Sequence, residues 1–156
     1  MNRWHLLPTA LLLAAAAPLS AQTAAAPTVS ASAPLKLTPA DEKRLFDAGQ
    51  RYTRWFLAGR ADSLMGVLSA ETATQINGIE GIRDMMGQVA ERAGVETEMT
   101  EEKLTRRNGY PQFWHAAKFR DFTDDELVLR WVMELDGKVR GIGFGPKSRS
   151  PEPDPS

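Results

Sequence analysis

The sequence predicts an α+β domain in which three N-terminal helices pack on one face of a curved antiparallel sheet. Helical spacing of apolar residues is confined to the first half of the folded part. The second half contains two turn dipeptides, Asn108-Gly109 and Asp136-Gly137, each flanked by residues typical of strands. A 156-residue chain with 42% hydrophobic residues has room for one such domain with a real core.

The ends of the chain are expected to lie outside this domain. Residues 1–21 have the pattern of a signal peptide, with cleavage expected after Ala21. Their apolar run, Leu6 to Ala17, is too short for a helix across a bilayer of about 30 Å, so stable membrane insertion after cleavage is not expected. We therefore expect an exported protein, periplasmic or secreted, from a bacterium.

Two further segments have compositions typical of flexible chain. Residues 22–37 are rich in Ala, Pro, Thr and Ser, which predicts a spacer. Residues 146–156 are rich in proline and charge, which predicts a disordered tail. The domain is therefore expected to span residues 38–145.

Capping residues and apolar stripes predict the helices. Thr38-Pro39 opens the first, which carries Tyr52 and Phe56 on its apolar face and ends at Gly59. Asp62 is expected to cap a short second helix that runs to Leu68.

The next segment combines a strand pattern with a helix start. Alternation over residues 72–76 predicts a short strand. Asn77 with Glu80 resembles a capping box for the third helix, whose apolar stripe includes Met86 and which Gly94 should close.

Two hairpins are predicted, over residues 95–119 and 126–144, each with a two-residue turn that requires positive φ. The first turn sets Glu102 opposite His115, and the second sets Trp131 opposite Ile142. In the second hairpin the other face carries three glycines opposite larger residues: Gly141, Gly143 and Gly145 against Val132, Arg130 and Val128.

Three segments in this order resemble the nuclear-transport-factor-2-like superfamily, also called SnoaL-like, which includes the ketosteroid isomerases. They are Gln50-Arg51-Tyr52, the stretch from Asn77 to Arg83, and the stretch from Met133 to Val139. The resemblance implies a cone-shaped fold with an apolar pocket, and often a homodimer formed through the sheet. Fold alone does not imply chemistry.

The resemblance extends to one of the three catalytic positions of the isomerases. Tyr52 matches their oxyanion-stabilising tyrosine, but Trp131 stands where they have a strand acid. The segment that carries their base is short here, and its sole acid is Glu71. We therefore assign no catalytic residue.

Six residues are candidates for lining a ligand pocket, because aromatic and apolar side chains commonly line such pockets. The alternative for each is ordinary core packing, or for His115 a structural pair with Glu102. The six are Tyr52, Phe56, Met86, Trp114, His115 and Trp131.

Composition narrows the function further. A formal net charge of -1 offers no basic surplus for nucleic acid, and the absence of cysteine excludes disulfides and thiol nucleophiles. No metal-ligand spacing or cofactor loop is present.

The sequence thus predicts an exported domain that binds a small apolar ligand or a partner in a cone pocket, without catalysis. Two alternatives remain: an isomerase- or dehydratase-like enzyme using Tyr52 with His115 or Glu71, and a structural homodimerising module.

Overall fold

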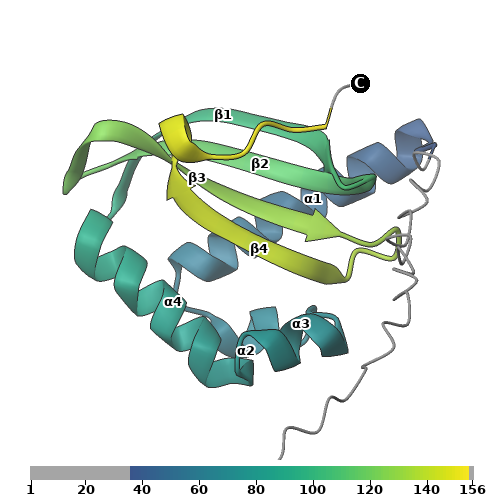
Figure 1. Ribbon diagram of the computed structural model, residues 1–156, viewed down its shortest axis with the longest axis horizontal. Helices are drawn as coiled ribbons and strands as arrows, with labels where there is room; N and C mark the ends of the chain where they lie inside the picture. The colour runs from purple at the N-terminus through teal and green to yellow at the C-terminus, as the bar shows by residue number, and fades with distance from the viewer. Residues whose placement is uncertain (1–35, 155–156) are drawn as a thin grey trace, which may run out of the picture. The chain divides into compact units, whose positions relative to one another are not determined.

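The computed structural model describes residues 36–154, so the predicted signal peptide and almost all of the predicted spacer lie outside the described residues. Within them, four helices precede a four-stranded antiparallel sheet (Figure 1), which confirms the α+β prediction. None of these helices is long and apolar enough to cross a membrane. The elements are α1 Pro39–Leu57, α2 Ala61–Met65, α3 Ala70–Gln75, α4 Gly78–Ala93, β1 Glu96–Arg107, β2 Tyr110–Phe119, β3 Phe122–Met133, β4 Val139–Pro146 and a 3-10 helix Lys147–Arg149.

Helix α1 begins as its capping residues predict. The Thr38 hydroxyl accepts a hydrogen bond from the Asp41 amide at 3.2 Å, and the Asp41 carboxylate accepts from Thr38 in return. The helix stops before Gly59, whose φ of 69° lies in the left-handed region.

The strand predicted at residues 72–76 is wrong, because this stretch forms helix α3. The Ser69 hydroxyl caps it by accepting from the Thr72 amide at 3.2 Å, and Thr72 is buried. In this helix the alternate positions do not share a face, since Thr72 is buried and Thr74 is exposed. The predicted second helix is also shorter than expected: it ends at Met65, and Leu68 instead forms a parallel bridge to Val139 at the edge of the sheet.

The capping box predicted for the start of α4 is also wrong. Asn77 has a φ of 62° and makes no side-chain cap, so its role is to turn the chain sharply from α3 into α4. Glu80 pairs with Arg83 at 2.7 Å on the helix surface. Gly94, with a φ of 73°, ends the helix as predicted.

The sheet is a simple meander in the order β1-β2-β3-β4. Asn108 and Gly109 have φ values of 52° and 79°, as a two-residue hairpin turn requires. The predicted pairing of Glu102 with His115 is therefore confirmed.

The second hairpin reaches its predicted register by a different route. Only Gly137 has a positive φ, and its amide donates to the Glu134 carbonyl, so a longer loop replaces the predicted two-residue turn. A register shift between Val132 and Met133 compensates for the longer loop. Trp131 consequently pairs with Ile142, as predicted.

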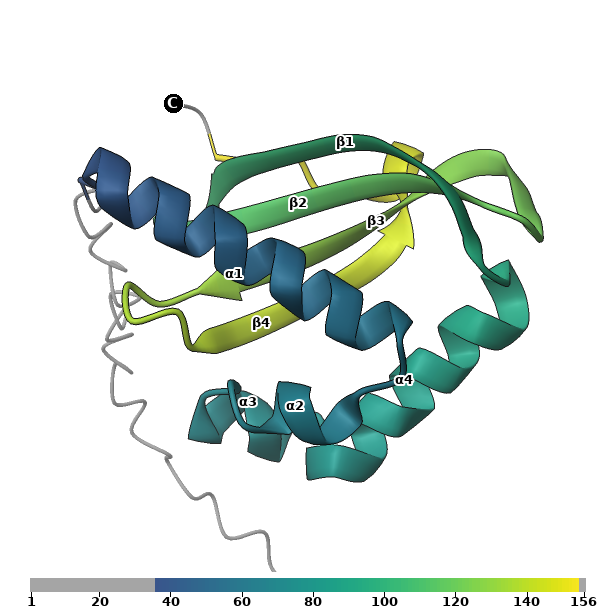
Figure 2. The ribbon, with the colours of Figure 1, turned by 180° about the vertical axis from the view of Figure 1, so that it is seen from behind.

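Helix α1 runs across one face of the sheet, called here the inner face, and α2, α3 and α4 lie on the β4 side of the sheet (Figure 2). Side chains from both layers fill the space between them. Gly49 lets α1 approach β2 closely, since a Cβ at this position would overlap the Phe113 ring. The side chains with no measurable exposure include Leu45, Leu64, Phe113, Trp131, Met133 and Val139.

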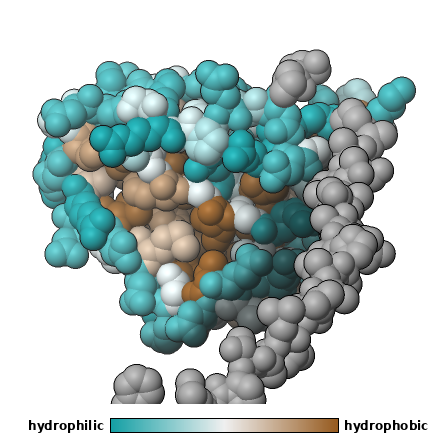
Figure 3. All heavy atoms as spheres, viewed as in Figure 1, coloured by the Kyte–Doolittle hydropathy of each residue, from teal (hydrophilic) through white to brown (hydrophobic). Residues whose placement is uncertain are grey.

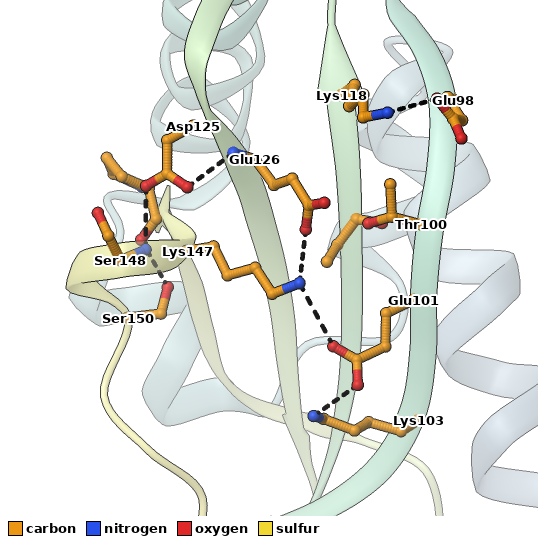
Figure 4. A network of polar contacts seen from close by, with 12 residues as sticks. Glu98, Thr100, Glu101, Lys103, Lys118, Asp125, Glu126, Lys147, Ser148 and Ser150 are labelled. Atoms are coloured by element: carbon orange, nitrogen blue, oxygen red, sulfur yellow. Dashed lines mark hydrogen bonds and ion pairs between the residues drawn. The ribbon is translucent and has the colours of Figure 1, made fainter.

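The opposite, outer face is crossed by the segment from Lys147 to Asp154, called here the C-terminal segment (Figure 1). At its start, the Lys147 ammonium contacts Glu126 at 2.6 Å and Glu101 at 3.8 Å (Figure 4). At its end, the Asp154 amide donates to the Arg106 carbonyl at 3.0 Å. Residues 147–154 of the predicted tail thus lie against the outer face of the sheet, with contacts at both ends of the segment.

Charge pairing stabilises the start of this segment. The hydrogen bond from Lys147 lowers the pKa of the Glu126 carboxyl and raises the pKa of Lys147 itself, although burial opposes both shifts. The Asp125 carboxylate also accepts from the Ser148 amide at 3.0 Å (Figure 4). A homodimer through the sheet, which stays a prediction, would have to accommodate this segment on the outer face.

Candidate functional site

Three of the six candidate ligand residues form one aromatic cluster inside the core. The Trp131 ring lies edge-on to Tyr52, with centroids 5.9 Å apart, and to Phe56, with centroids 6.1 Å apart. All three are buried, and Met86 belongs to the same core. The structure therefore brings four of the six candidates together between the helices and the sheet.

The polar atoms of this cluster have protein partners. The Tyr52 hydroxyl donates to the Gly137 carbonyl at 2.9 Å, and the Trp131 indole nitrogen donates to the Thr53 hydroxyl at 2.9 Å. Buried donors are normally satisfied in this way, and here they also fix how α1 sits on β3 and on the β3–β4 loop.

Trp114 lies apart from these residues, on the outer face of the sheet. It packs with Ala116 and Val128 in a small separate cluster, and the Lys103 ammonium lies 5.2 Å from its ring centroid. The sheet itself separates Trp114 from the other five candidates.

His115 lies on the inner face between two carboxylates. Its Nδ1 is 2.9 Å from Glu102 and its Nε2 is 3.0 Å from Glu96, while the Gln50 amide donates to Glu102 at 2.7 Å. The histidine is 5% exposed. The Glu96–His115–Glu102 triad thus links β2 to the start and the middle of β1 and, through Gln50, to α1.

The surroundings of His115 favour its charged form. Burial on its own would lower the pKa of the imidazole, but the hydrogen bonds and negative charges of Glu96 and Glu102 outweigh burial and raise the pKa. A protonated ring donates from both nitrogens, which matches an acceptor at each side.

Glu96 was not among the predicted residues. Continuing the register of the Asn108-Gly109 turn would place Glu96 two positions farther along β2, beyond Phe119. Two register shifts in β1 instead pair Glu96 with Phe119 and bring its carboxylate to His115. Bulges of this kind carry no clear sequence signal in a strand as polar as β1.

The residues of the enzyme alternative have separate partners. The Tyr52 hydroxyl is engaged by Gly137 and His115 by its two glutamates, whereas Glu71 is exposed on α3 and accepts from Gln75. Among the described residues, no group of three or more His, Cys, Asp or Glu side chains is arranged to hold a metal ion.

An apolar cleft lies at the surface between α4 and the β3–β4 end of the sheet. Its volume is about 360 Å³. Figure 3 shows hydrophobic residues gathered on this side of the molecule, in the region between β4 and the helices. This cleft, called here the α4 cleft, is lined by Met85, Gln88, Val89, Arg92, Ala93, Phe122, Leu127, Phe144, Gly145 and Pro146.

The α4 cleft lies next to the predicted ligand residue Met86 but is lined by a neighbouring stripe of the helix. Met86 is buried in the core, whereas Met85 is half-buried and faces the cleft. Gln88 and Arg92, one and two turns farther along α4, provide polar groups at the rim. Met85, Phe122 and Phe144 are therefore functional candidates that the sequence pattern did not single out.

Comparison of the chain with protein-family models, with curated proteins and with solved structures found no match in any of the three. Its class therefore rests on the structure: an α+β domain with an open, four-stranded antiparallel sheet whose inner face is covered by helices. The site geometry adds an apolar surface cleft and a carboxylate–histidine–carboxylate triad whose histidine is buried.

Proposed function

We propose that this domain binds a small molecule with an apolar body in the α4 cleft, without converting it, and that it does so after export. The observation that carries the proposal is the lining of the cleft. Met85, Phe122 and Phe144 are only half-buried, so they present apolar surface beside the core. Covering such surface is favourable at about 25 cal/mol per Å².

The size of the cleft favours a small molecule over a protein partner. Its 360 Å³ lies near the lower end of the roughly 300–1,000 Å³ typical of small-molecule pockets. Gln88 and Arg92 at the rim supply an amide and a positive charge. The ligand class that fits is an apolar molecule with one anionic or hydrogen-bond-accepting end.

The arrangement of the elements is compatible with a nuclear-transport-factor-2-like cone, which we propose as the finer fold. In support, α1 runs across the inner face of a sheet that follows the helices in the chain. In this proposal the cone interior is occupied by the aromatic cluster of Tyr52, Phe56 and Trp131, and ligand binding moves to the α4 cleft at its side.

The test is binding of 8-anilinonaphthalene-1-sulfonate, which combines an apolar body with an anionic end, followed by fluorescence. The wild-type protein should show saturable binding under native conditions. Met85→Glu places a negative charge in the cleft, where it repels the sulfonate and makes the apolar lining polar. The affinity for the dye should therefore fall about tenfold or more.

Ala90→Glu is the matched control, because Ala90 is exposed on the same helix and does not line the cleft. It introduces the same charge in the same helix and should leave the affinity unchanged. Equal affinities for the two variants, or no saturable binding by the wild type, would contradict the proposal.

A further inference from the structure

Two arginines on the outer face of the sheet lack a carboxylate partner among the described residues. Arg107 donates only to the Glu152 carbonyl, at 3.4 Å, and Arg130 makes no ion pair within the described part of the chain. Two carboxylates on the same face, those of Glu101 and Glu126, are engaged by Lys147.

Arg130 is held against the neighbouring strand by a glycine. It pairs with Gly143 across β3 and β4, and a Cβ at Gly143 would lie 2.6 Å from one of its terminal nitrogens. The absence of a side chain therefore makes room for the guanidinium. This gives Gly143 a specific role, because a glycine in a strand otherwise weakens it.

The Arg130 guanidinium is partly buried there, and its hydrogen-bond donors are not all satisfied. Its Nε is buried and has no hydrogen-bond partner among the described residues. Burial, and secondarily the charge of Arg107, lower the pKa of Arg130. An unsatisfied buried donor costs stability, so its retention calls for an explanation.

A second buried donor lies beside it. Trp114 is the cross-strand partner of Arg130 on β2, and its indole nitrogen is likewise buried without a described partner. Trp114 does not line the cleft described next, so the donors that face an oxyanion, which offers acceptors only, are those of the arginines.

A small cleft of about 190 Å³ opens at this place. At ~30 Å³ for a water molecule in liquid, the cleft has room for a group of a few heavy atoms with its hydration. Its lining contains two arginines and an amide but no carboxylate, and the C-terminal segment borders it at Pro151. The lining residues include Arg107, Gln112, Arg130, Gly141, Gly143 and Pro151.

We propose that this outer-face cleft binds a small oxyanion, a phosphate or a carboxylate group, held by the guanidiniums of Arg130 and Arg107. Arginine suits both groups because its planar fork can donate two parallel hydrogen bonds to their oxygens. The site is separate from the α4 cleft, so it does not depend on the function proposed above.

The experiment is a thermal-melting titration of the protein with sodium phosphate and, separately, with sodium acetate, at an ionic strength held constant with sodium chloride. We expect a saturable rise in melting temperature with at least one of the two anions. In Arg130→Met this rise should disappear. The same variant should melt above the wild type in buffer without either anion, because the unpaired buried donor is gone.

Two glycine variants in one strand supply a second, milder comparison. Gly143→Ala should displace the Arg130 guanidinium and weaken anion binding about tenfold, the loss expected for one charge-assisted contact. Gly145→Ala has no neighbour within 4 Å of the added Cβ and should bind like the wild type.

Melting temperatures that rise equally in the wild type and Arg130→Met would overturn the proposal, since the effect would then be unspecific. So would a wild type that responds to neither anion, or Gly143→Ala and Gly145→Ala variants of equal affinity.

Discussion

Replacing Gly49 with alanine tests the closest contact between helix and sheet. Gly49 lies in the middle of α1, and an added Cβ would overlap the Phe113 ring where it joins the β2 backbone. Phe113 has no measurable exposure, so its ring has no free space into which to move. The overlap must be relieved by shifting α1 away from the sheet.

Two opposing effects set the change in the free energy of unfolding caused by Gly49→Ala. Alanine is favoured over glycine in a helix interior by about 1 kcal/mol. Overpacking a well-filled core typically costs about 1–3 kcal/mol and occasionally more. Because the overlap here involves the root of a fully buried ring, we expect overpacking to dominate and Gly49→Ala to lower the free energy of unfolding by about 1–3 kcal/mol.

Gly87→Ala on α4 is the control, since Gly87 is exposed and an added Cβ would meet nothing within 4 Å. Only the propensity effect acts there, so this variant should gain up to about 1 kcal/mol. Urea denaturation of both variants measures the difference. If Gly49→Ala is as stable as the wild type or more stable, the inference that α1 packs too closely on β2 to accept a Cβ at this position is wrong.

Two further predictions concern buried polar groups. His115→Gln should lower stability by roughly 1–3 kcal/mol at pH 6, where hydrogen bonds to charged partners are intact. Because folding raises the pKa of His115, its contribution is present below the ordinary pKa of about 6.5 and is lost as pH rises through the folded value. We therefore expect the free energy of unfolding of the wild type to fall relative to that of His115→Gln as the pH rises. Urea titrations between pH 6 and pH 9, in steps of ~0.5 pH unit, measure this, and parallel plots of stability against pH for the two proteins would refute it. Tyr52→Phe removes the hydrogen bond to Gly137 and should cost about 0.5–1.5 kcal/mol without changing dye affinity, whereas an unchanged urea midpoint would exclude a structural role for the hydroxyl.

The strand pairing could be predicted well from sequence because hairpin dipeptides fix register locally. Asn108-Gly109 gave both the turn and the pairing of Glu102 with His115. At Asp136-Gly137 the predicted register was correct although the turn was not, because a bulge in the hairpin offset the longer loop. Register is constrained by the apolar face as well as by the turn, which explains why it survived the error.

The errors lie where short-range patterns compete. Residues 72–76 alternate like a strand, but the Ser69 cap and the helical context decide for α3. Asparagine suits both a helix cap and the left-handed region of backbone conformation. At Asn77 the path of the chain between α3 and α4 requires the left-handed conformation.

The sites could be predicted only in part. His115 and Glu102 follow from register, but Glu96 depends on two bulges. The apolar residues were identified as a set, yet sequence periodicity does not tell which side chains fill a core and which border a cleft. Met85 and Met86 are neighbours of the same type, and the packing of α4 alone separates their roles.

The course of the C-terminal segment has a mechanical consequence. Leu37 and Pro39, at the entrance to α1, border the same groove as Pro153 and Asp154, so both ends of the domain meet at one corner. A pulling force applied between the ends enters the molecule there, and the contacts of Asp154 with Arg106 and Gly109 stand first in its path. The segment can thus peel away and uncover the outer face before the load reaches the core layer between α1 and the sheet.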